Sequence, residues 1–356
     1  MYLVLLVLPS ACSQCCILGL YIINLISGLL LADVAINLHE SSECEVPSSF
    51  KDFVDATTKD KTAGTLTAGA SLLSNSCFLA YGTVAAGPLL VDIFPGLGLN
   101  PIVGTGIFAA IICFITVTQN NTNLEKIANA IVVVVFSSFA VLLMPSLANV
   151  VDPVGAFLTP GTNPDGFSAA ASAVPLLLSS LMYQNIVPSI SKLLDFNRTK
   201  ITIAIVVGSF IPMLMYVAWC YADIGGGLDN SIGSSAGAIA FTAFSSSALF
   251  VSSLTAVMSL AEEYESIFSK TSVKDDDEDG DCPLSNQFSI PAVAASVLPS
   301  LVVAVLCAEG GDLTGALHFN GAVIIPYLYG VLPIILYNSV RTLQPPTSSF
   351  PQRLKD

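Results

Sequence analysis

Charged residues are scarce in this sequence. Only 11% of its 356 residues are Asp, Glu, Lys or Arg, whereas roughly a quarter of the residues in a soluble domain are charged. So few charges cannot solvate the surface of a soluble chain of this length, which excludes a soluble fold. The 12 Lys and Arg residues form no basic cluster, so we expect no nucleic-acid partner.

Histidine is scarcer still, with two residues in the chain. Cys12, Cys15 and Cys16 therefore have no histidine partners for a metal site, and a second cysteine pair is also missing. His39 begins a zincin-like pattern, but Glu43 replaces its second histidine. The nine cysteines follow no disulfide framework. With no nucleophile–base pair and no phosphate loop, the sequence predicts no enzyme, metal or cofactor.

Long apolar runs are abundant. Hydrophobic residues make up 53% of the chain, and the mean hydropathy is +0.76. A helix needs about 20 apolar residues to span a bilayer, and the runs are continuous, unlike the short alternating strands of a membrane barrel. We therefore predict one all-α polytopic membrane domain over residues 1–356. Its nine segments are Cys15–Leu38, Leu66–Val91, Pro101–Thr118, Ile127–Leu147, Ala169–Ile190, Ile201–Ala222, Ala236–Ala261, Ser289–Ala308 and Leu317–Tyr337.

The basic residues indicate the topology. With nine helices, all 12 Lys and Arg residues fall on one side of the membrane, which the positive-inside rule identifies as cytoplasmic, or stromal in a plastid. The same side receives an acidic loop at residues 267–287 and a tail at 339–356. Asp275 opens this loop like a calcium site, but Asn286 stands where a bidentate Glu is required, so we interpret the run as a solvated linker. The sequence does not distinguish between the plasma membrane and the plastid envelope as the location of the protein.

The same topology predicts where three acidic residues lie relative to the membrane. Asp33, Glu262 and Glu263 fall near the inside ends of their segments. Contact with the polar interface costs less there than burial would, so we expect all three to face the interface. The apolar N-terminus has no preceding Lys or Arg, and we expect it not to be a cleaved signal peptide.

The fifth segment carries polar residues at membrane depth. Its centre contains Ser179, Ser180, Tyr183, Gln184 and Asn185, and Pro188 follows. Proline cannot donate to the carbonyl four residues earlier, and it disfavours helical geometry at the residue before it. The segment is therefore either a helix broken at Tyr183–Pro188, as at transporter binding sites, or an ordinary proline kink with polar packing contacts.

Several stretches resemble the aromatic amino acid permeases for tryptophan and tyrosine, and most closely their plant and algal relatives. The strongest are SSLMYQNIVPSISKLLD and the Gly-Ser-Phe-Ile-Pro element at residues 208–212. Weaker likeness covers the segment ending near Asp33, the stretch around LLSNSCFLAYGTVAAGPLLV, and SSLTAVMSLAEEYESIF. The resemblance implies membership of the amino acid–polyamine–organocation superfamily, with a leucine-transporter-like inverted-repeat fold and a broken segment at the substrate site.

Within the resemblance, the chain would be a secondary transporter of aromatic amino acids, with alternating access around the break. A proton or sodium would be the coupling ion, and the oligomeric state stays open. The implied substrate site is Ser180, Tyr183, Gln184, Asn185, Asn75, Tyr81, Ser252 and Ser253.

This sequence departs from the family pattern in two respects. Gln184 occupies the family's histidine position, which weakens any proton relay there. The nine segments match family helices two to ten, so we expect an incomplete gene model without the glycine-rich first helix. A degenerate, non-transporting relative that acts as a membrane scaffold is the alternative.

Overall fold

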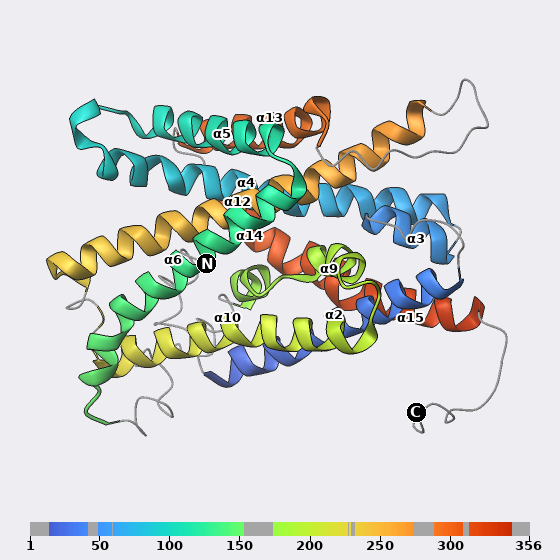
Figure 1. Ribbon diagram of the computed structural model, residues 1–356, viewed down its shortest axis with the longest axis horizontal. Helices are drawn as coiled ribbons and strands as arrows, with labels where there is room; N and C mark the ends of the chain where they lie inside the picture. Colours follow the sequence, from blue (N-terminus) through green and yellow to red (C-terminus); the bar gives the residue numbers. More distant parts are fainter. Residues whose placement is uncertain are drawn as a thin grey trace.

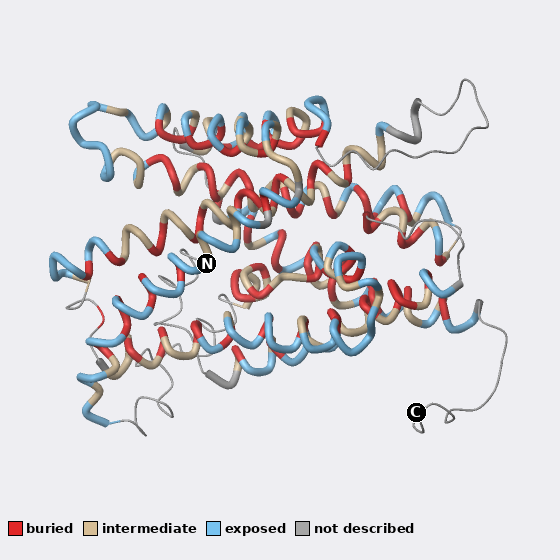
Figure 2. Tube along the Cα trace, viewed as in Figure 1, coloured by how far each residue is buried: buried red, intermediate tan, exposed pale blue. Residues whose placement is uncertain are grey.

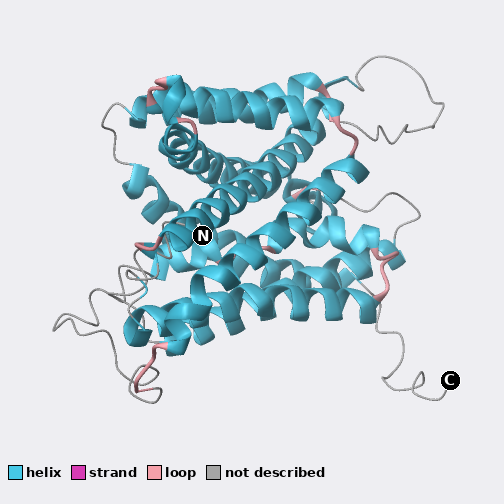
Figure 3. Cartoon of the chain, turned by 60° about the vertical axis from the view of Figure 1, so that its left-hand side comes forward, coloured by secondary structure: helices cyan, strands magenta, loops and turns pink. Residues whose placement is uncertain are grey.

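The described part of the chain is mostly helical. The computed structural model describes residues 14–41, 49–58, 60–152, 174–226, 228, 232–272, 288–308 and 313–343, and these ranges contain no strand (Figure 3). A short helix at residues 174–180 has no label of its own. The labelled helices are α2 (Gln14–Ser41), α3 (Phe50–Thr58), α4 (Lys61–Ile93), η2 (Pro95–Leu97), α5 (Pro101–Thr118), α6 (Asn121–Ala148), η3 (Gln184–Ile186), α9 (Val187–Leu193), α10 (Arg198–Gly226), α12 (Ser235–Ser272), α13 (Ile290–Ala308), α14 (Leu313–Phe319), η4 (Asn320–Ile324), η5 (Pro326–Val331) and α15 (Leu332–Leu343).

Eight helices in the described part of the chain are long and apolar enough to cross a membrane. They coincide with eight of the nine predicted segments, and the remaining one, around residues 174–193, consists of shorter helices. These spans turn apolar side chains outward: Phe114 is 67% exposed, and Val133 and Met144 are each 66% exposed. Lipid can cover such apolar faces, whereas exposing them to water would be unfavourable. The protein is therefore an integral, multi-pass, all-α membrane protein.

Helix α2 shows how burial is distributed in these spans. Its buried face carries Asn24 and Ser27, while Ile22 and Ile26 are exposed. A soluble amphipathic helix has the opposite pattern. Figure 2 shows the same arrangement across the molecule, with exposed residues along the outer edges of the helices and buried residues facing inward.

The helices form two groups with the interrupted segment between them (Figure 1). In one group, α4, α5, α12 and α13 pack on one another. In the other, α2 packs against α10 and α15. Helix α6 contacts both α12 and α10 and so joins the groups. Side chains at the facing surfaces of the two groups can therefore reach the interrupted segment.

The α4–α5 contact brings two backbones together at glycines. A Cβ atom on Gly87 would lie 2.5 Å from the carbonyl oxygen of Pro101, and one on Gly104 would lie 2.6 Å from the carbonyl oxygen of Gly87. Small residues are common where membrane helices pack together. They let the two backbones approach closely, and the resulting van der Waals contacts stabilise the packing.

We expect Gly104→Ala to destabilise the protein by about 1–3 kcal/mol, because the added methyl group has backbone atoms in its way. Gly106→Ala is the matched control: it lies on the same helix, and a Cβ there would meet no atom within 4 Å. Thermal unfolding of the detergent-purified variants measures the difference. Equal unfolding midpoints for the two variants would contradict this account of the contact.

Two predicted loop boundaries are wrong. The predicted acidic loop spans residues 267–287, but α12 continues to Ser272. The predicted tail spans residues 339–356, but α15 continues to Leu343. Glu and Lys are good helix formers outside the bilayer too, so helix α12 continues past its apolar portion. The calcium-like run at 275–286, the N-terminal stretch at 1–13 and the rest of the tail lie outside the described residues.

Candidate substrate cavity at the broken segment

The fifth predicted segment is interrupted at its centre. The helix at residues 174–180 ends, Leu181 to Tyr183 are non-helical, and η3 then leads into α9. Pro188 stands in the first turn of α9. Val187 has helical angles (φ −59°, ψ −43°), so the expectation that Pro188 would disfavour them is wrong. A first-turn proline is tolerated because its missing N–H has no partner within the helix anyway, and the interruption therefore lies earlier than Pro188.

Side chains replace the missing helical hydrogen bonds at this interruption. The Tyr183 backbone amide donates to Oε1 of Gln184 at 3.0 Å, and Nε2 of Gln184 donates to Oδ1 of Asn24 at 2.8 Å. The Tyr183 hydroxyl donates to the Asn24 carbonyl oxygen at 3.1 Å. Gly28 leaves room for the tyrosine, since a Cβ there would lie 2.5 Å from the hydroxyl oxygen. These contacts fasten the interrupted segment to α2.

We expect Gln184→Leu to destabilise the protein by about 1–3 kcal/mol, because it leaves the buried Asn24 amide without this partner. Removing both amides in Asn24→Leu/Gln184→Leu should cost less than the sum of the two single changes. Thermal unfolding of the wild type, both single variants and the double variant gives the coupling. Strictly additive losses would show that the Asn24–Gln184 contact does not hold the segment.

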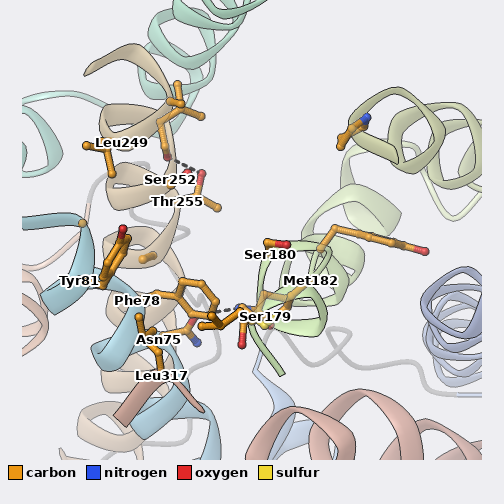
Figure 4. Close-up of a pocket in the computed structure, with 18 of the residues that line it drawn as sticks. Asn75, Phe78, Tyr81, Ser179, Ser180, Met182, Leu249, Ser252, Thr255 and Leu317 are labelled. Carbon is orange, nitrogen blue, oxygen red and sulfur yellow. Dashed lines mark hydrogen bonds between the residues drawn. The ribbon is translucent and has the colours of Figure 1, made fainter. Parts of the chain in front are cut away.

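A cavity of about 310 Å³ opens beside the interruption. In Figure 4, α4 presents Asn75, Phe78 and Tyr81 to it, and α12 presents Leu249, Ser252 and Thr255. The interrupted segment contributes Ser179, Ser180 and Met182. The wall also contains Tyr183, Asn185, Tyr216 and Leu317. It is thus largely apolar and aromatic, with a few amide and hydroxyl groups.

The structure brings most of the predicted site residues together. The cavity is lined by Asn75, Tyr81, Ser180, Tyr183, Asn185 and Ser252. Gln184 and Ser253 are not at the wall: Gln184 is fully buried against α2, and Ser253 packs against Gly82 of α4. Consecutive residues of a helix point about 100° apart, since a turn takes about 3.6 residues. Ser252 faces the cavity, and Ser253 is turned toward α4 instead.

One edge of the cavity is a polar network across four elements. Nδ2 of Asn185 donates to Oδ1 of Asn75 at 2.7 Å. The Tyr329 hydroxyl of η5 donates to Oδ1 of Asn185, and Nδ2 of Asn75 donates to the Ser259 hydroxyl of α12 at 3.4 Å. The network joins the interrupted segment to α4, α12 and η5, so a ligand that binds Asn185 also acts on these three elements.

The resemblance implies a substrate site at a broken membrane segment, and the structure has a cavity beside such a segment. The family model described as the tryptophan/tyrosine permease family matches residues 9–231. The chain belongs to this family. No curated protein sequence matches it. The family is one of amino acid transporters, and the matched range of this permease includes α2, α4, α10 and the interrupted segment, whereas the α12 side of the cavity lies beyond it.

Sequence reasoning missed several residues of the permease cavity, among them Phe78, Met182, Tyr216 and Leu317. Phe78 could have been found, because it lies three residues from both Asn75 and Tyr81 and so shares their helix face. Leu317 and Tyr216 carry no comparable signal. They reach the wall through the packing of α14 and α10, which no local pattern indicates.

The acidic residues at the helix ends differ from one another. Asp33 pairs with Arg198 at 3.1 Å, and both side chains are partly exposed, as expected for the interface. Glu263 is 4% exposed, so its predicted interfacial position is wrong. Helix α3 packs against the end of α12, where the Ser266 hydroxyl donates to Oδ2 of Asp52 at 2.9 Å. This contact covers the part of α12 that contains Glu263.

No metal site is seen in the ranges that the structure covers: they contain no group of three or more His, Cys, Asp or Glu side chains able to hold a metal ion.

Proposed function

We propose that this protein is a secondary transporter of aromatic amino acids, and that its substrate binds in the cavity beside the interrupted segment. The observation that carries the proposal is the position of an aromatic-lined cavity of about 310 Å³ next to a broken membrane segment in a member of this permease family. Its volume is at the lower end of the range for small-molecule sites, roughly 300–1,000 Å³.

The wall offers suitable groups for each part of an aromatic amino acid. Phe78, Tyr81 and Tyr216 provide ring surfaces against which an indole or phenol could pack. The helix ends at the break leave backbone carbonyl and amide groups without partners in their own helices. Those groups and the Asn185 amide can pair with the ammonium and carboxylate of the substrate.

Alternating access would use the break as its moving part. The interrupted segment is fastened to α2 through Gln184 and Tyr183, and it meets α4 and η5 through Asn185. A movement of α2 and the interrupted segment against α4 and α12 would therefore open one side of the cavity while closing the other.

The orientation proposed from the basic residues receives support from the fold. Helices α3 and α15 pack against each other, and both belong to the lysine- and arginine-bearing side. The Asp33–Arg198 pair joins α2 to the start of α10 on this same predicted side. We propose that this end of the molecule faces the cytoplasm or the stroma.

Uptake into proteoliposomes tests the proposal. The full chain is purified, reconstituted and supplied with radiolabelled tryptophan, tyrosine or phenylalanine, with alanine, glutamate and lysine as comparison substrates. We expect saturable uptake of the aromatic amino acids and competition among them. Binding of tryptophan without uptake would favour the non-transporting alternative, and neither binding nor uptake of any amino acid would overturn the proposal.

A further inference from the structure

Asn320 is a polar side chain inside an apolar membrane span. It is the first residue of η4, lies within the span Gly315–Thr342 and is 0% exposed. Neither Nδ2 nor Oδ1 of its amide has a hydrogen-bond partner among the described residues. Lipid offers no partner either, so burial of both ends of this amide costs stability unless another molecule pairs with them.

The helix changes its geometry at the same residue. Helix α14 ends at Phe319, and the wider π-helical turns of η4 begin at Asn320. Such turns are rare and are often found at functional sites. The change of geometry and the unpaired amide are two separate observations, and both single out Asn320.

A second unpaired polar group lies on α4, against which η4 packs. Ser74 is fully buried, and its hydroxyl oxygen has no hydrogen-bond partner in the described part of the chain. Thr67 precedes it by seven residues and so shares its face of the helix. The Thr67 hydroxyl lies 3.1 Å from the Tyr327 hydroxyl of η5. The face of α4 that carries Ser74 is therefore turned toward the last membrane span.

The two unpaired groups lie in the same stretch of this interface. The contact of α4 with Tyr327 marks one point, and the cavity wall, which contains Phe78 of α4 and Leu317 of α14, marks another (Figure 4). Between these points the residue numbers rise along α4 and fall along the last span, as in an antiparallel pair. Ser74 and Asn320 are both within the interval.

Both groups are one helical turn from residues of the substrate cavity. Leu317 precedes Asn320 by three residues, and Phe78 follows Ser74 by four. Side chains three or four residues apart are neighbours on a helix surface. The unpaired amide and hydroxyl thus lie next to two side chains of the cavity wall.

The chemistry of the amide indicates which substrate suits it. An asparagine amide both donates and accepts, so a partner must do the same to satisfy its two ends. The phenolic hydroxyl of tyrosine donates and accepts, the indole N–H of tryptophan only donates, and the phenyl ring of phenylalanine does neither. Among the aromatic amino acids, tyrosine therefore matches Asn320 best.

We propose that Asn320 and Ser74 form a polar subsite of the cavity that binds the phenolic hydroxyl of tyrosine, and that this subsite selects tyrosine over phenylalanine. The inference rests on the proposed transport function and names the residues that choose among its aromatic substrates. The ring of tyrosine packs beside Phe78 and turns the Leu317 side chain aside, which brings the hydroxyl to Asn320.

Three hydrogen bonds then close the subsite. Nδ2 of Asn320 donates to the substrate oxygen, the substrate hydroxyl donates to Ser74, and the Ser74 hydroxyl donates to Oδ1 of Asn320. Each of the three groups donates once and accepts once, so both ends of the amide are paired. With phenylalanine in the cavity, the amide stays unpaired.

The test measures uptake of labelled tyrosine into proteoliposomes that contain the full chain, with unlabelled amino acids as competitors. Tyrosine is compared with phenylalanine and with para-fluorophenylalanine, whose fluorine fills part of the space of the hydroxyl but donates no hydrogen bond. We expect tyrosine to halve the uptake at a concentration at least about tenfold lower than either competitor, because a site built to bind a hydroxyl rejects analogues that lack it.

Asn320→Leu should remove this preference. Leucine has a similar size and no polar group, so we expect tyrosine to compete only as well as phenylalanine, while phenylalanine competes as it does in the wild type. Ser74→Ala should reduce the preference in the same direction and by less. A wild-type preference for tyrosine in Asn320→Leu would overturn the proposal.

Asn338→Leu is the matched control. It makes the same substitution in the same membrane span, at an exposed position of α15 that is not part of the cavity wall. We expect this variant to prefer tyrosine as strongly as the wild type does. Loss of the preference in this variant as well would show that the effect of Asn320→Leu is not specific to the subsite.

Thermal unfolding separates a substrate subsite from a structural contact. Asn320→Leu removes an unpaired buried amide, so without substrate its unfolding midpoint should equal or exceed that of the wild type. Tyrosine should raise the midpoint of the wild type more than that of the variant. A lower midpoint of the substrate-free variant would assign the amide to a structural contact and contradict the proposal.

The subsite and the transport function fail in different ways. Wild-type uptake that tyrosine and phenylalanine inhibit at equal concentrations would refute the subsite and leave the transport function standing. This comparison needs no variant, so it decides the question even if Asn320→Leu does not fold. If the wild type takes up no amino acid and binds none, the transport function itself fails, and the subsite fails with it.

Discussion

Replacing Asn185 with leucine is expected to lower the initial rate of tryptophan uptake by about a hundredfold or more. The Asn185 side chain lines the cavity, donates to Asn75 and accepts from Tyr329. Leucine has a similar size and can do neither. A buried polar group left without its partner costs about 1–3 kcal/mol, and two such groups would be left in addition to any lost contact with the substrate.

Asn149→Leu is the control for this change. Asn149 is an exposed residue at the C-terminal end of α6, away from the cavity wall. Both variants are compared with the wild type after size-exclusion chromatography has confirmed that each is monodisperse. Uptake by Asn185→Leu within a few-fold of the wild type would show that the network is not part of the transport site.

Gly321→Ala is expected to have the second largest effect. Gly321 lies in η4 against the first part of the interrupted segment, and a Cβ there would overlap the carbonyl oxygen of Pro175 and lie 2.8 Å from Oγ of Ser179. The carbonyl is backbone, so the helix at residues 174–180 would have to move. That helix carries the cavity residues Ser179 and Ser180, so the added methyl group should impair both folding and transport.

We expect Gly321→Ala to lower the free energy of unfolding by at least about 1–3 kcal/mol, as overpacking of a buried contact does, and to reduce tryptophan uptake in parallel. Gly330→Ala is matched to it, because Gly330 lies in the neighbouring η5 and a Cβ there would meet nothing within 4 Å. Thermal unfolding and uptake are measured on both variants. Indistinguishable results would mean that η4 does not fix the position of the interrupted segment.

The continuous helices could be predicted from the sequence because their signal is local. An apolar run such as IVVVVFSSFAVLLM in α6 must be satisfied within its own segment, whatever surrounds it. The interruption of the fifth segment was also visible in the polar residues Tyr183 to Asn185. Its position was less predictable, because Pro188 is compatible with the first turn of a helix as well as with a break.

The directions of individual side chains depend on contacts between distant residues. Gln184 and Asn185 are neighbours, yet one binds Asn24 of α2 while the other binds Asn75 of α4 and faces the cavity. The rotation of the segment determines which of the two side chains faces the cavity. This rotation depends on hydrogen-bonding partners that lie more than a hundred residues away in the sequence. The same holds for Glu263, whose burial results from the packing of α3 over α12.

The π-helical turns were not predictable either. η4 and η5 follow α14 within one predicted apolar segment, and nothing in its composition indicates the wider turns. They nevertheless position two residues that matter here, Gly321 against Pro175 and Tyr329 against Asn185. π-Helical turns often occur at functional sites, which agrees with their place beside the cavity.

The central claim is that an amino acid binds between α4, α12 and the interrupted segment, and a structure of the full chain with tryptophan tests it most directly. The account predicts density for the indole ring among Phe78, Tyr81 and Tyr216, with the amino acid backbone near Asn185 and the end of the helix at residues 174–180. Tryptophan bound elsewhere, with this cavity empty at saturating ligand, would contradict it.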